Sequence, residues 1–317
     1  MNVLVTGGTG FLGRAVCRAL VERGHRVRSF ARNTHYRLDA YGVEQFRGDI
    51  RDVAAVRRAT AACDAVVHCA AMAAHWGSWT EFWQINVTGT ANVVAACRTQ
   101  GVPRLVHTST ASVVFDGRSI EGAGESLPYG RCLDRYPDTK KAAEQIALRA
   151  NDKTLATTAL RPHLVWGHGD PHFAPVLAGQ VRGSSIVLPG DGRNLIDTVH
   201  VVDAANAHAL AVERLTSSSP LAGRPYFITQ GSPRPRDQAV AELLAAQLGR
   251  PVRVRHLPRT PVMLMATAGE FLHRRLVTSK EPALTRFIVA ELTTSHWFDI
   301  SAARRDLGYN PRPTPTF

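Results

Sequence analysis

The first half of the chain alternates between short apolar runs and longer amphipathic stretches. The apolar runs are rich in β-branched residues and have the length of buried strands, and the stretches between them have helical spacing. The predicted strands are Asn2–Thr6, Arg26–Phe30, Val43–Phe46, Ala65–His68, Arg104–Thr108 and Thr154–Leu160. The predicted helices are Leu12–Arg23, Val53–Ala62, Glu81–Gln100 and Tyr136–Ala150. This alternation indicates an α/β fold with a Rossmann-type, doubly wound parallel sheet.

The pattern loosens after Arg161. Glycine and proline interrupt the following segment, and the helical stretches Val201–Glu213 and Asp237–Leu248 are mixed with short strands. We therefore expect a smaller substrate-binding cap in addition to the sheet domain. The expected division is a Rossmann domain at 1–160, to which 196–215 returns, and a cap formed by 161–195 and 216–317.

One stretch of the expected cap, Pro261–Val277, is apolar at its start and basic at its end. Such a composition suits a helix that lies on a membrane surface or lines a lipid pocket. A cap helix packed on the core explains it equally simply, and we favour that interpretation.

Length and composition fit a globular protein. With 317 residues, of which 44% are hydrophobic, the chain can bury a full core. Its net charge of +12 raises nucleic acid or an anionic surface as partners. The basic residues are scattered along the chain, however, so we favour a solvated arginine-rich surface and expect no nucleic acid partner.

Cysteine usage and hydropathy bear on metal content and compartment. The five cysteines form no CxxC pair, and no cluster of histidine and cysteine has zinc spacing, so we expect reduced thiols and no metal. The chain starts directly on a strand-like run without a secretory signal. No apolar run reaches the roughly 18 residues that span a bilayer. We expect a cytoplasmic protein, with peripheral attachment to a membrane left open.

A glycine-rich turn, GGTGFLG, joins the first predicted strand to the first predicted helix. In this context Gly7 allows a tight turn, Gly10 lets the backbone approach a pyrophosphate, and Gly13 permits close packing of helix on strand. The phosphates then bind N–H groups at the helix N-terminus, where Phe11 and Leu12 lie. The turn predicts a dinucleotide-binding site.

The end of the second predicted strand indicates which dinucleotide is bound. A carboxylate there bonds the ribose 2′-hydroxyl of NAD, whereas an arginine accommodates the 2′-phosphate of NADP. The sequence at this point is Ser-Phe-Ala-Arg, which contains no carboxylate and ends in Arg32. We predict NADP(H), with NAD(H) as the alternative.

Tyr136 and Lys140 have i, i+4 spacing, which places both side chains on one face of a helix. A phenol has a reference pKa of about 10, and an adjacent ammonium stabilises the phenolate. Tyr136 can then exchange a proton with a carbonyl or an alcohol, and Lys140 can also hold the nicotinamide ribose. A cluster of hydroxyl residues at 108–112, at the end of the fifth strand, strengthens this interpretation because ligands bind at that edge of parallel sheets.

The glycine turn, HTSTASV and YPDTK together resemble the extended short-chain dehydrogenases/reductases, and within them the 3β-hydroxysteroid dehydrogenase-like group. The resemblance covers the whole chain. It places the family's catalytic serine on Thr110, with Ser109 and Ser112 as the other candidates. It also implies a supporting role for Asn86, whereas His68 is expected to be a packed, hydrogen-bonded residue. The further cofactor contacts that it implies are Asp49, Ile50, Ala70, Ala71 and Pro162.

Within this group, runs such as STASVVFDG and WGSW are most similar to two branches, which act on 2-alkyl-3-oxoalkanoates and on sterol-4α-carboxylates. Both substrates carry a ketone or hydroxyl β to a carboxylate on a hydrophobic scaffold. The resemblance implies NADPH-dependent reduction of a 2-alkyl-3-oxoalkanoate to the 3-hydroxy acid, with the sterol dehydrogenase as the alternative. We expect Trp76, Trp79 and Trp166 to form apolar walls for this substrate.

Two other functions stay open on the same fold: a nucleotide-sugar epimerase or dehydratase, and a non-catalytic NADP-binding module. The Tyr136 and Lys140 pair argues against a module, since a sensor needs no proton donor. The apolar start of Pro261–Val277 favours a lipid over a sugar. We expect a homodimer that acts on a small hydrophobic substrate, and contact with a membrane or a pathway enzyme stays open.

Overall fold

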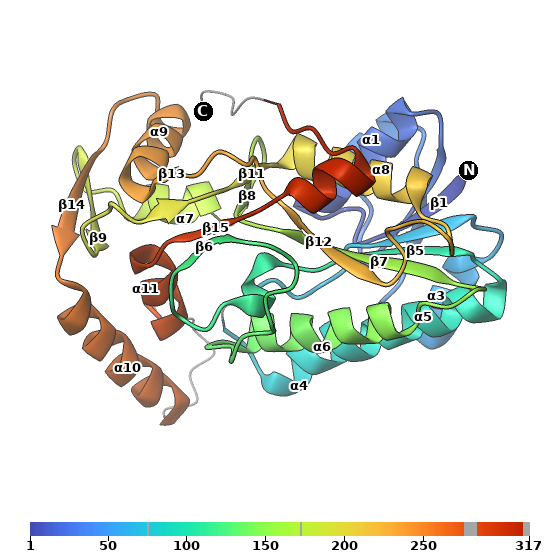
Figure 1. Cartoon of the computed structure of the whole chain (residues 1–317), viewed down its shortest axis with the longest axis horizontal. Coiled ribbons are helices and arrows are strands. Elements are labelled where there is room, and N and C mark those ends of the chain that lie inside the picture. Colours follow the sequence, from blue (N-terminus) through green and yellow to red (C-terminus); the bar gives the residue numbers. More distant parts are fainter. Residues whose placement is uncertain (75, 172, 276–283, 313–317) are drawn as a thin grey trace.

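The computed structural model describes residues 1–74, 76–171, 173–275 and 284–312. Its largest element is a parallel sheet of seven strands in the order β12-β7-β5-β4-β1-β2-β3, with helices on both faces (Figure 1). The strands are β1 (Asn2–Thr6), β2 (Arg26–Ala31), β3 (Glu44–Arg47), β4 (Ala65–His68), β5 (Arg104–Thr108), β7 (Ala156–Pro162) and β12 (Arg224–Ile228). The strand order reverses between β1 and β4, which confirms the predicted doubly wound fold.

Two groups of helices bury the two faces of this sheet. On one face lie α1 (Phe11–Glu22) and α8 (Val201–Arg214), and on the other α3 (Val53–Thr60), α5 (Gly89–Gln100) and α6 (Arg135–Arg149) (Figure 1). Val3 and Val5 of β1 belong to the core that contains α1 and α8, whereas Leu4 belongs to the core that contains α3 and α5. Because successive side chains of a strand point to opposite faces, an apolar run is required wherever both faces are covered.

The predicted helix Glu81–Gln100 is interrupted in the structure. It is built from α4 (Trp79–Phe82), a π-helical segment (Trp83–Thr88) and α5. π-Helical turns inside α-helices are rare and often lie at functional sites. The short helix α2 (Tyr36–Ala40), between β2 and β3, was not predicted.

The cap lies beside the central sheet, on the left of Figure 1. Its core includes Ile186, Leu244 and Trp166. One sheet has four strands: β13 (Arg234–Pro235), β10 (Leu195–Ile196), β15 (His296–Phe298) and β6 (Ile120–Ala123). Two strand pairs complete it: β8 (Val165–Trp166) with β11 (Val199–His200), and β9 (Ser185–Pro189) with β14 (Arg253–Leu257). Its helices are α7 (Phe173–Gly179), α9 (Arg236–Leu248), α10 (Arg259–Arg275) and α11 (Arg286–Thr293).

Two of the expected boundaries between sheet domain and cap are wrong. The segment 216–317 was assigned to the cap, but β12 pairs with β7 and forms the seventh strand of the central sheet. Conversely, β6 lies within the expected sheet domain 1–160 but pairs with β15 of the cap. Both strands are short, and their partners lie far away in the sequence, so local patterning does not reveal where they pair.

Two further properties concern membrane-spanning helices and the cysteines. None of the helices built from the described residues has the length and apolar content that a bilayer crossing requires. All five cysteines are free thiols, and Cys17, Cys63 and Cys97 are buried.

Candidate active site

The glycine turn has the geometry of a phosphate cradle. Gly7 has a φ of +69°, which L side chains rarely adopt, and a Cβ there would lie 2.8 Å from the Cα of Ala70. A Cβ on Gly13 would lie 2.1 Å from the carbonyl oxygen of Gly7. Gly10 is the extended residue before α1, whose first N–H groups have no partner within the helix. The turn therefore fits a dinucleotide pyrophosphate, since it presents bare backbone at a helix N-terminus.

The strand ends beside this turn meet as expected. Because β1, β4, β5 and β7 are parallel, their carboxyl ends lie at one edge of the sheet. Ala70, which follows β4 with Ala71, donates its backbone N–H to the Thr6 hydroxyl at 3.3 Å. Pro162 ends β7 at the same edge and is buried. The predicted contacts of the pyrophosphate and nicotinamide thus converge around the turn.

Positive charge gathers where the adenosine end of a dinucleotide would lie. Burial and the charge of Arg37 lower the pKa of Arg14, and both arginines lower the pKa of His35 after the larger effect of burial. Arg32 is exposed, and its charge contributes to the lowered pKa of Asp49. Arg32 alone was predicted from the sequence, because Arg14 and Arg37 come close only through the folding of α1 and α2.

Asp49 is held by an arginine of its own loop. Arg51 donates to Asp49 Oδ1 from Nε at 2.9 Å and to Oδ2 from Nη2 at 2.7 Å, and these bonds are the main reason that the pKa of Asp49 falls to about 2. Ile50 beside it is buried against the start of α5, where a Cβ on Gly89 would lie 2.8 Å from its Cγ2. Both residues lie on the loop after β3, which is the predicted adenine side.

Asn86 lies in the π-helical segment and connects the loop after β4 to α6. Its Oδ1 accepts the backbone N–H of Met72 at 2.7 Å, and its Nδ2 donates to Thr139 Oγ1 at 3.0 Å. Thr139 immediately precedes Lys140 in α6. Asn86 is therefore placed to support the site, as the resemblance implies.

Thr110 and Tyr136 meet at the carboxyl edge of the sheet. The Thr110 side chain lowers the pKa of Tyr136, which indicates that the two hydroxyls lie close together. Thr110 also donates to Ser112 Oγ at 3.3 Å, whereas the backbone N–H of Ser109 donates to Leu160 O at 2.6 Å. Of the three candidate hydroxyls, Thr110 is thus the one that the fold places against the phenol.

Lys140 is buried one helical turn beyond Tyr136. Its Nζ donates to the carbonyl oxygen of Thr108 at 2.6 Å. Burial lowers the pKa of Lys140 to about 8, while the Cys69 thiol and the Glu144 carboxylate limit the fall. At neutral pH the side chain is therefore mostly protonated, and its positive charge lies inside the site.

Burial has the largest effect on the phenol of Tyr136. Burial raises the pKa of Tyr136 to about 12; the hydrogen bond from Thr110 opposes the rise, and the negative charge of Glu291 adds to it. Burial raises this pKa because the charged form of the phenol loses its hydrating water. Tyr136 is consequently a protonated phenol at neutral pH, which suits a proton donor.

A buried ion pair that was not predicted from the sequence fixes α6 to β7. Arg161 donates to Glu144 from Nη2 at 2.6 Å and from Nε at 3.0 Å, and the Tyr129 hydroxyl donates to Glu144 at 2.7 Å. Glu144 is fully buried and Arg161 is 2% exposed. The i, i+4 series Tyr136, Lys140 and Glu144 was visible in the sequence, but its partner Arg161 was not.

The buried histidines nearby are neutral. His68 hydrogen-bonds Thr6 at 2.7 Å and Thr90 at 2.9 Å, and burial lowers its pKa to about 3. His208 is bonded to the Thr108 hydroxyl at 2.8 Å, and burial lowers its pKa to about 4. His68 is thus the packed, hydrogen-bonded residue that we expected.

The three tryptophans expected to wall the substrate do not lie together. Trp76 lines a small pocket with Leu133, Arg135 and Phe287. Of these residues, Arg135 immediately precedes Tyr136 in the chain. Trp79 is 42% exposed and packs against Trp83, and Trp166 is 5% exposed in the core of the cap, where its Nε1 donates to Thr198. Trp76 is therefore the predicted tryptophan that lines this pocket, whereas Trp166 fills the core of the cap, and a substrate contact of Trp79 stays a prediction.

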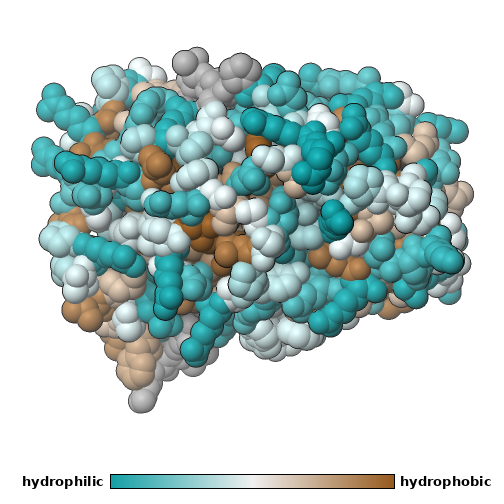
Figure 2. Space-filling model, viewed as in Figure 1, coloured by the Kyte–Doolittle hydropathy of each residue, from teal (hydrophilic) through white to brown (hydrophobic). Residues whose placement is uncertain are grey.

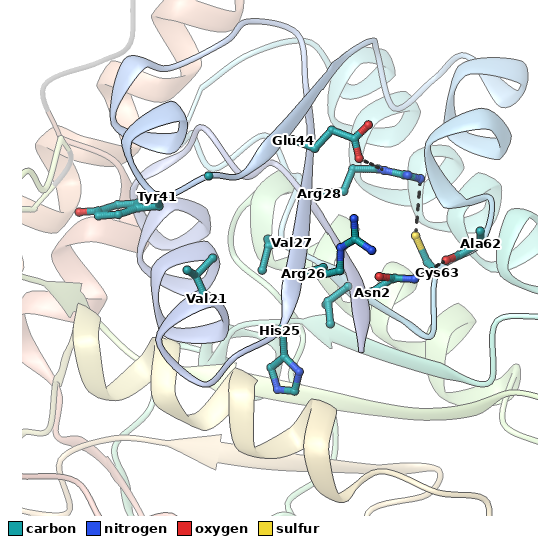
Figure 3. A pocket seen from close by; sticks show the side chains of 12 residues that line it. Asn2, Val21, His25, Arg26, Val27, Arg28, Tyr41, Glu44, Ala62 and Cys63 are labelled. Atoms are coloured by element: carbon teal, nitrogen blue, oxygen red, sulfur yellow. Dashed lines mark hydrogen bonds and ion pairs between the residues drawn. The ribbon is translucent and has the colours of Figure 1, made fainter.

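A second pocket of about 500 Å³ lies at the opposite edge of the sheet (Figure 3). It is lined by the amino ends of β1, β2 and β3, including Asn2, Arg26 and Glu44. Arg28 within it is paired with Glu44 at 3.1 Å. Its position away from the hydroxyl cluster separates it from the candidate active site.

Comparison with known proteins identifies the family. The sequence profile of the 3-beta hydroxysteroid dehydrogenase/isomerase family matches residues 4–259. The chain belongs to this family. It is a nicotinamide-dependent oxidoreductase with the extended short-chain dehydrogenase/reductase fold, as the motifs predicted.

Relatives of this family cover nearly the whole chain. The 2-alkyl-3-oxoalkanoate reductase of Stenotrophomonas maltophilia (strain K279a) is 46% identical over 315 residues, which are 98% of this chain and 95% of the relative. The decarboxylating sterol-4-alpha-carboxylate 3-dehydrogenase of Mus musculus is 33% identical and covers 98% of this chain and 84% of its own. A structure of MoeE5 in complex with UDP-glucuronic acid and NAD has a TM-score of 0.72 at 26% identity, over 99% of this chain and 94% of its own.

Proposed function

We propose that the protein reduces the ketone of a 2-alkyl-3-oxoalkanoate to the secondary alcohol. The observation that carries this proposal is the contact of Tyr136 with Thr110, one helical turn from the buried Lys140. The name of the 46% identical relative supports the substrate class. The apolar residues Trp76, Leu133 and Phe287 line a small pocket together with Arg135, the residue before Tyr136, which suits a hydrophobic substrate.

Three side chains divide the protein's part of the chemistry. A nicotinamide bound at the glycine turn supplies the hydride that reduces the ketone carbon. Tyr136 donates its phenol proton to the ketone oxygen, so that the carbonyl becomes CH–OH. Thr110 orients that oxygen through its hydroxyl. The Lys140 ammonium stabilises the phenolate that remains.

Arg135 is the proposed partner of the substrate carboxylate. It is the cationic residue among the described residues that line the pocket with Trp76, and it immediately precedes Tyr136. One of its guanidinium nitrogens donates to the carbonyl oxygen of Gly77, which fixes the side chain in the pocket wall. A planar guanidinium binds a carboxylate in a defined orientation. No arginine was predicted for this role from the sequence.

NADP(H) is the proposed cofactor. The support is the group of Arg14, Arg32 and Arg37 near the end of β2, where a 2′-phosphate would lie. Arginine pairs with phosphate through charge-assisted hydrogen bonds.

The decisive experiment follows NADPH absorbance with a synthetic 2-alkyl-3-oxo acid. We expect turnover, and a loss of about 10²- to 10⁴-fold in kcat for Tyr136→Phe, which removes the proton donor. Arg135→Gln should raise KM for the free acid but not for its methyl ester, and the exposed Arg131→Gln should change neither. Full turnover by Tyr136→Phe would exclude the mechanism. Oxidation of a 4α-carboxy-3β-hydroxysterol without reduction of the oxo acid would establish the sterol alternative instead.

A further inference from the structure

Helix α10 (Arg259–Arg275) has apolar side chains on two opposite faces. On the inner face, Val262 and Ala266 are buried against Val289 of α11. Glu270 on this face is also buried and is paired with Arg286 at 3.1 Å. The inner face therefore accounts for the attachment of α10 to the cap.

The outer face exposes large apolar side chains to solvent. Leu264 and Met265 are 66% and 67% exposed, and Phe271 and Leu272 are 57% and 55% exposed. Their helical spacing puts them on one side, opposite Val262 and Ala266. Figure 2 shows brown and tan residues at the lower left of the molecule, where Figure 1 draws α10. A solvent-exposed helix face is normally polar, so this one is suited to an apolar partner.

Exposed arginines lie shortly before this stripe in the chain. From Pro261 to Leu272 the sequence contains one charged residue, the inward-facing Glu270. Arg253 and Arg255 on β14, and Arg259 at the start of α10, are exposed. The outward Val187 of β9 lies opposite Arg255 in the strand pair, and it is 49% exposed. We call the apolar stripe and these three arginines the α10 face.

We propose that the α10 face docks on an anionic phospholipid surface. An apolar stripe flanked by arginine is the pattern of helices that lie in a membrane interface, where apolar side chains enter the acyl boundary and cations meet lipid phosphates. A second copy of this chain is a poorer partner, because the symmetric contact would bring the same three arginines together. The net charge of +12 also favours an anionic surface.

The position of α10 connects this surface to the candidate active site. Glu270 of α10 lines the pocket that contains Trp76 and Arg135, and the Trp76 ring contacts His273 of α10 edge-on at 6.0 Å. A docked α10 would place that pocket close to the lipid. This consequence for substrate entry rests on the proposed function, but the docking itself does not.

The test is co-sedimentation of the full chain with vesicles of phosphatidylcholine alone and with vesicles that also contain phosphatidylglycerol. We expect binding to the anionic vesicles that weakens with salt. The double variant Leu264→Glu, Met265→Glu should lose more than about tenfold in partitioning. Arg255→Gln and Arg259→Gln should each lose about fivefold on anionic vesicles. Val53→Glu, at an apolar site that is 56% exposed on α3, should bind like the unaltered protein.

Each other result overturns the proposal. Absence of binding to either vesicle, or equal partitioning of the glutamate variant and the unaltered protein, excludes a lipid surface. A dimer in solution that the glutamate variant abolishes, without vesicle binding, assigns the face to a second copy. Because sedimentation needs no substrate, failure here leaves the proposed reaction untouched, and turnover by the glutamate variant without vesicles shows that it is folded.

Discussion

Two regions of the chain reverse the usual distribution of side chains. Beneath the carboxyl edge of the sheet, Lys140, Glu144 and Arg161 are 3%, 0% and 2% exposed, although such residues rarely lose contact with water. On the α10 face, Leu264 and Met265 are two-thirds exposed, although such residues are usually buried. Short hydrogen bonds offset the burial of the interior charges, whereas the side chains of Leu264 and Met265 remain mostly exposed to solvent. The buried charges belong to the candidate active site, and the exposed apolar side chains belong to the surface that we propose to dock on lipid.

The largest effect should come from breaking the interior pair. Glu144→Gln leaves Arg161 buried without its counter-charge and should lower the free energy of unfolding by about 3–5 kcal/mol. Adding Arg161→Met should recover most of this loss, because no uncompensated charge remains. Urea denaturation measures both. Glu22→Gln, in a pair whose side chains are both 58% exposed, is the matched control and should cost no more than about 0.5 kcal/mol. A similar loss of unfolding free energy for Glu144→Gln and Glu22→Gln would contradict the special role of the buried pair.

Surface arginines should act on binding rather than stability. Arg32→Gln or Arg37→Gln removes a charge-assisted contact, which is worth about 1.5–3 kcal/mol, and should raise KM for NADPH by about ten- to a hundredfold. KM for NADH and the unfolding free energy should stay unchanged. Steady-state kinetics with both cofactors is the measurement, and a parallel rise in both KM values would contradict the assignment.

The charge of Lys140 should control the pH dependence of reduction. The ammonium is protonated below its pKa of about 8 and neutral above it. The rate should therefore be constant near pH 7 and should fall above pH 8, approaching about tenfold per pH unit. Lys140→Arg, which stays charged, should remove this decline if it supports turnover. An alkaline limb unchanged in that variant would assign the ionisation to another group.

The smallest effect should come from the outer stripe. Leu264→Ser changes an exposed side chain and should alter the unfolding free energy by less than about 0.5 kcal/mol. Val262→Ser, two residues away on the inner face, should cost more than about 2 kcal/mol because a hydroxyl replaces buried apolar contacts. Thermal denaturation without lipid compares the two. Equal losses would show that the stripe has a partner within the folded chain.

The nucleotide half of the site could be predicted because its signals are local. The glycine turn, the strand before it and the helix after it lie within the first 22 residues, and backbone sterics alone require glycine at Gly7 and Gly13. Tyr136 and Lys140 are one helical turn apart, so their common face followed from spacing. Thr110 required the resemblance, and its contact with Tyr136 came only from the structure.

The remainder depended on contacts between distant segments. Arg161 meets Glu144 across the interface of β7 and α6, and β12 joins β7 after a separation that no periodicity marks. Trp166 shows a second limit of prediction from sequence, since the sequence does not reveal whether an aromatic residue lines a pocket or fills a core. The rise in the pKa of Tyr136 likewise depends on burial, which spacing does not reveal.

The π-helical segment Trp83–Thr88 has a consequence for how this protein can vary. A π-turn is equivalent to one residue inserted into an α-helix, and it rotates the helix before it by about 100° relative to the helix after it. Deleting one residue there would restore a regular helix and turn α4, with its tryptophan, around the axis of α5. The bond from Asn86 to Thr139 would then fail even with every side chain of the site retained. Among homologues, the exposed positions of this segment should therefore tolerate substitutions, whereas insertions and deletions within it should be absent.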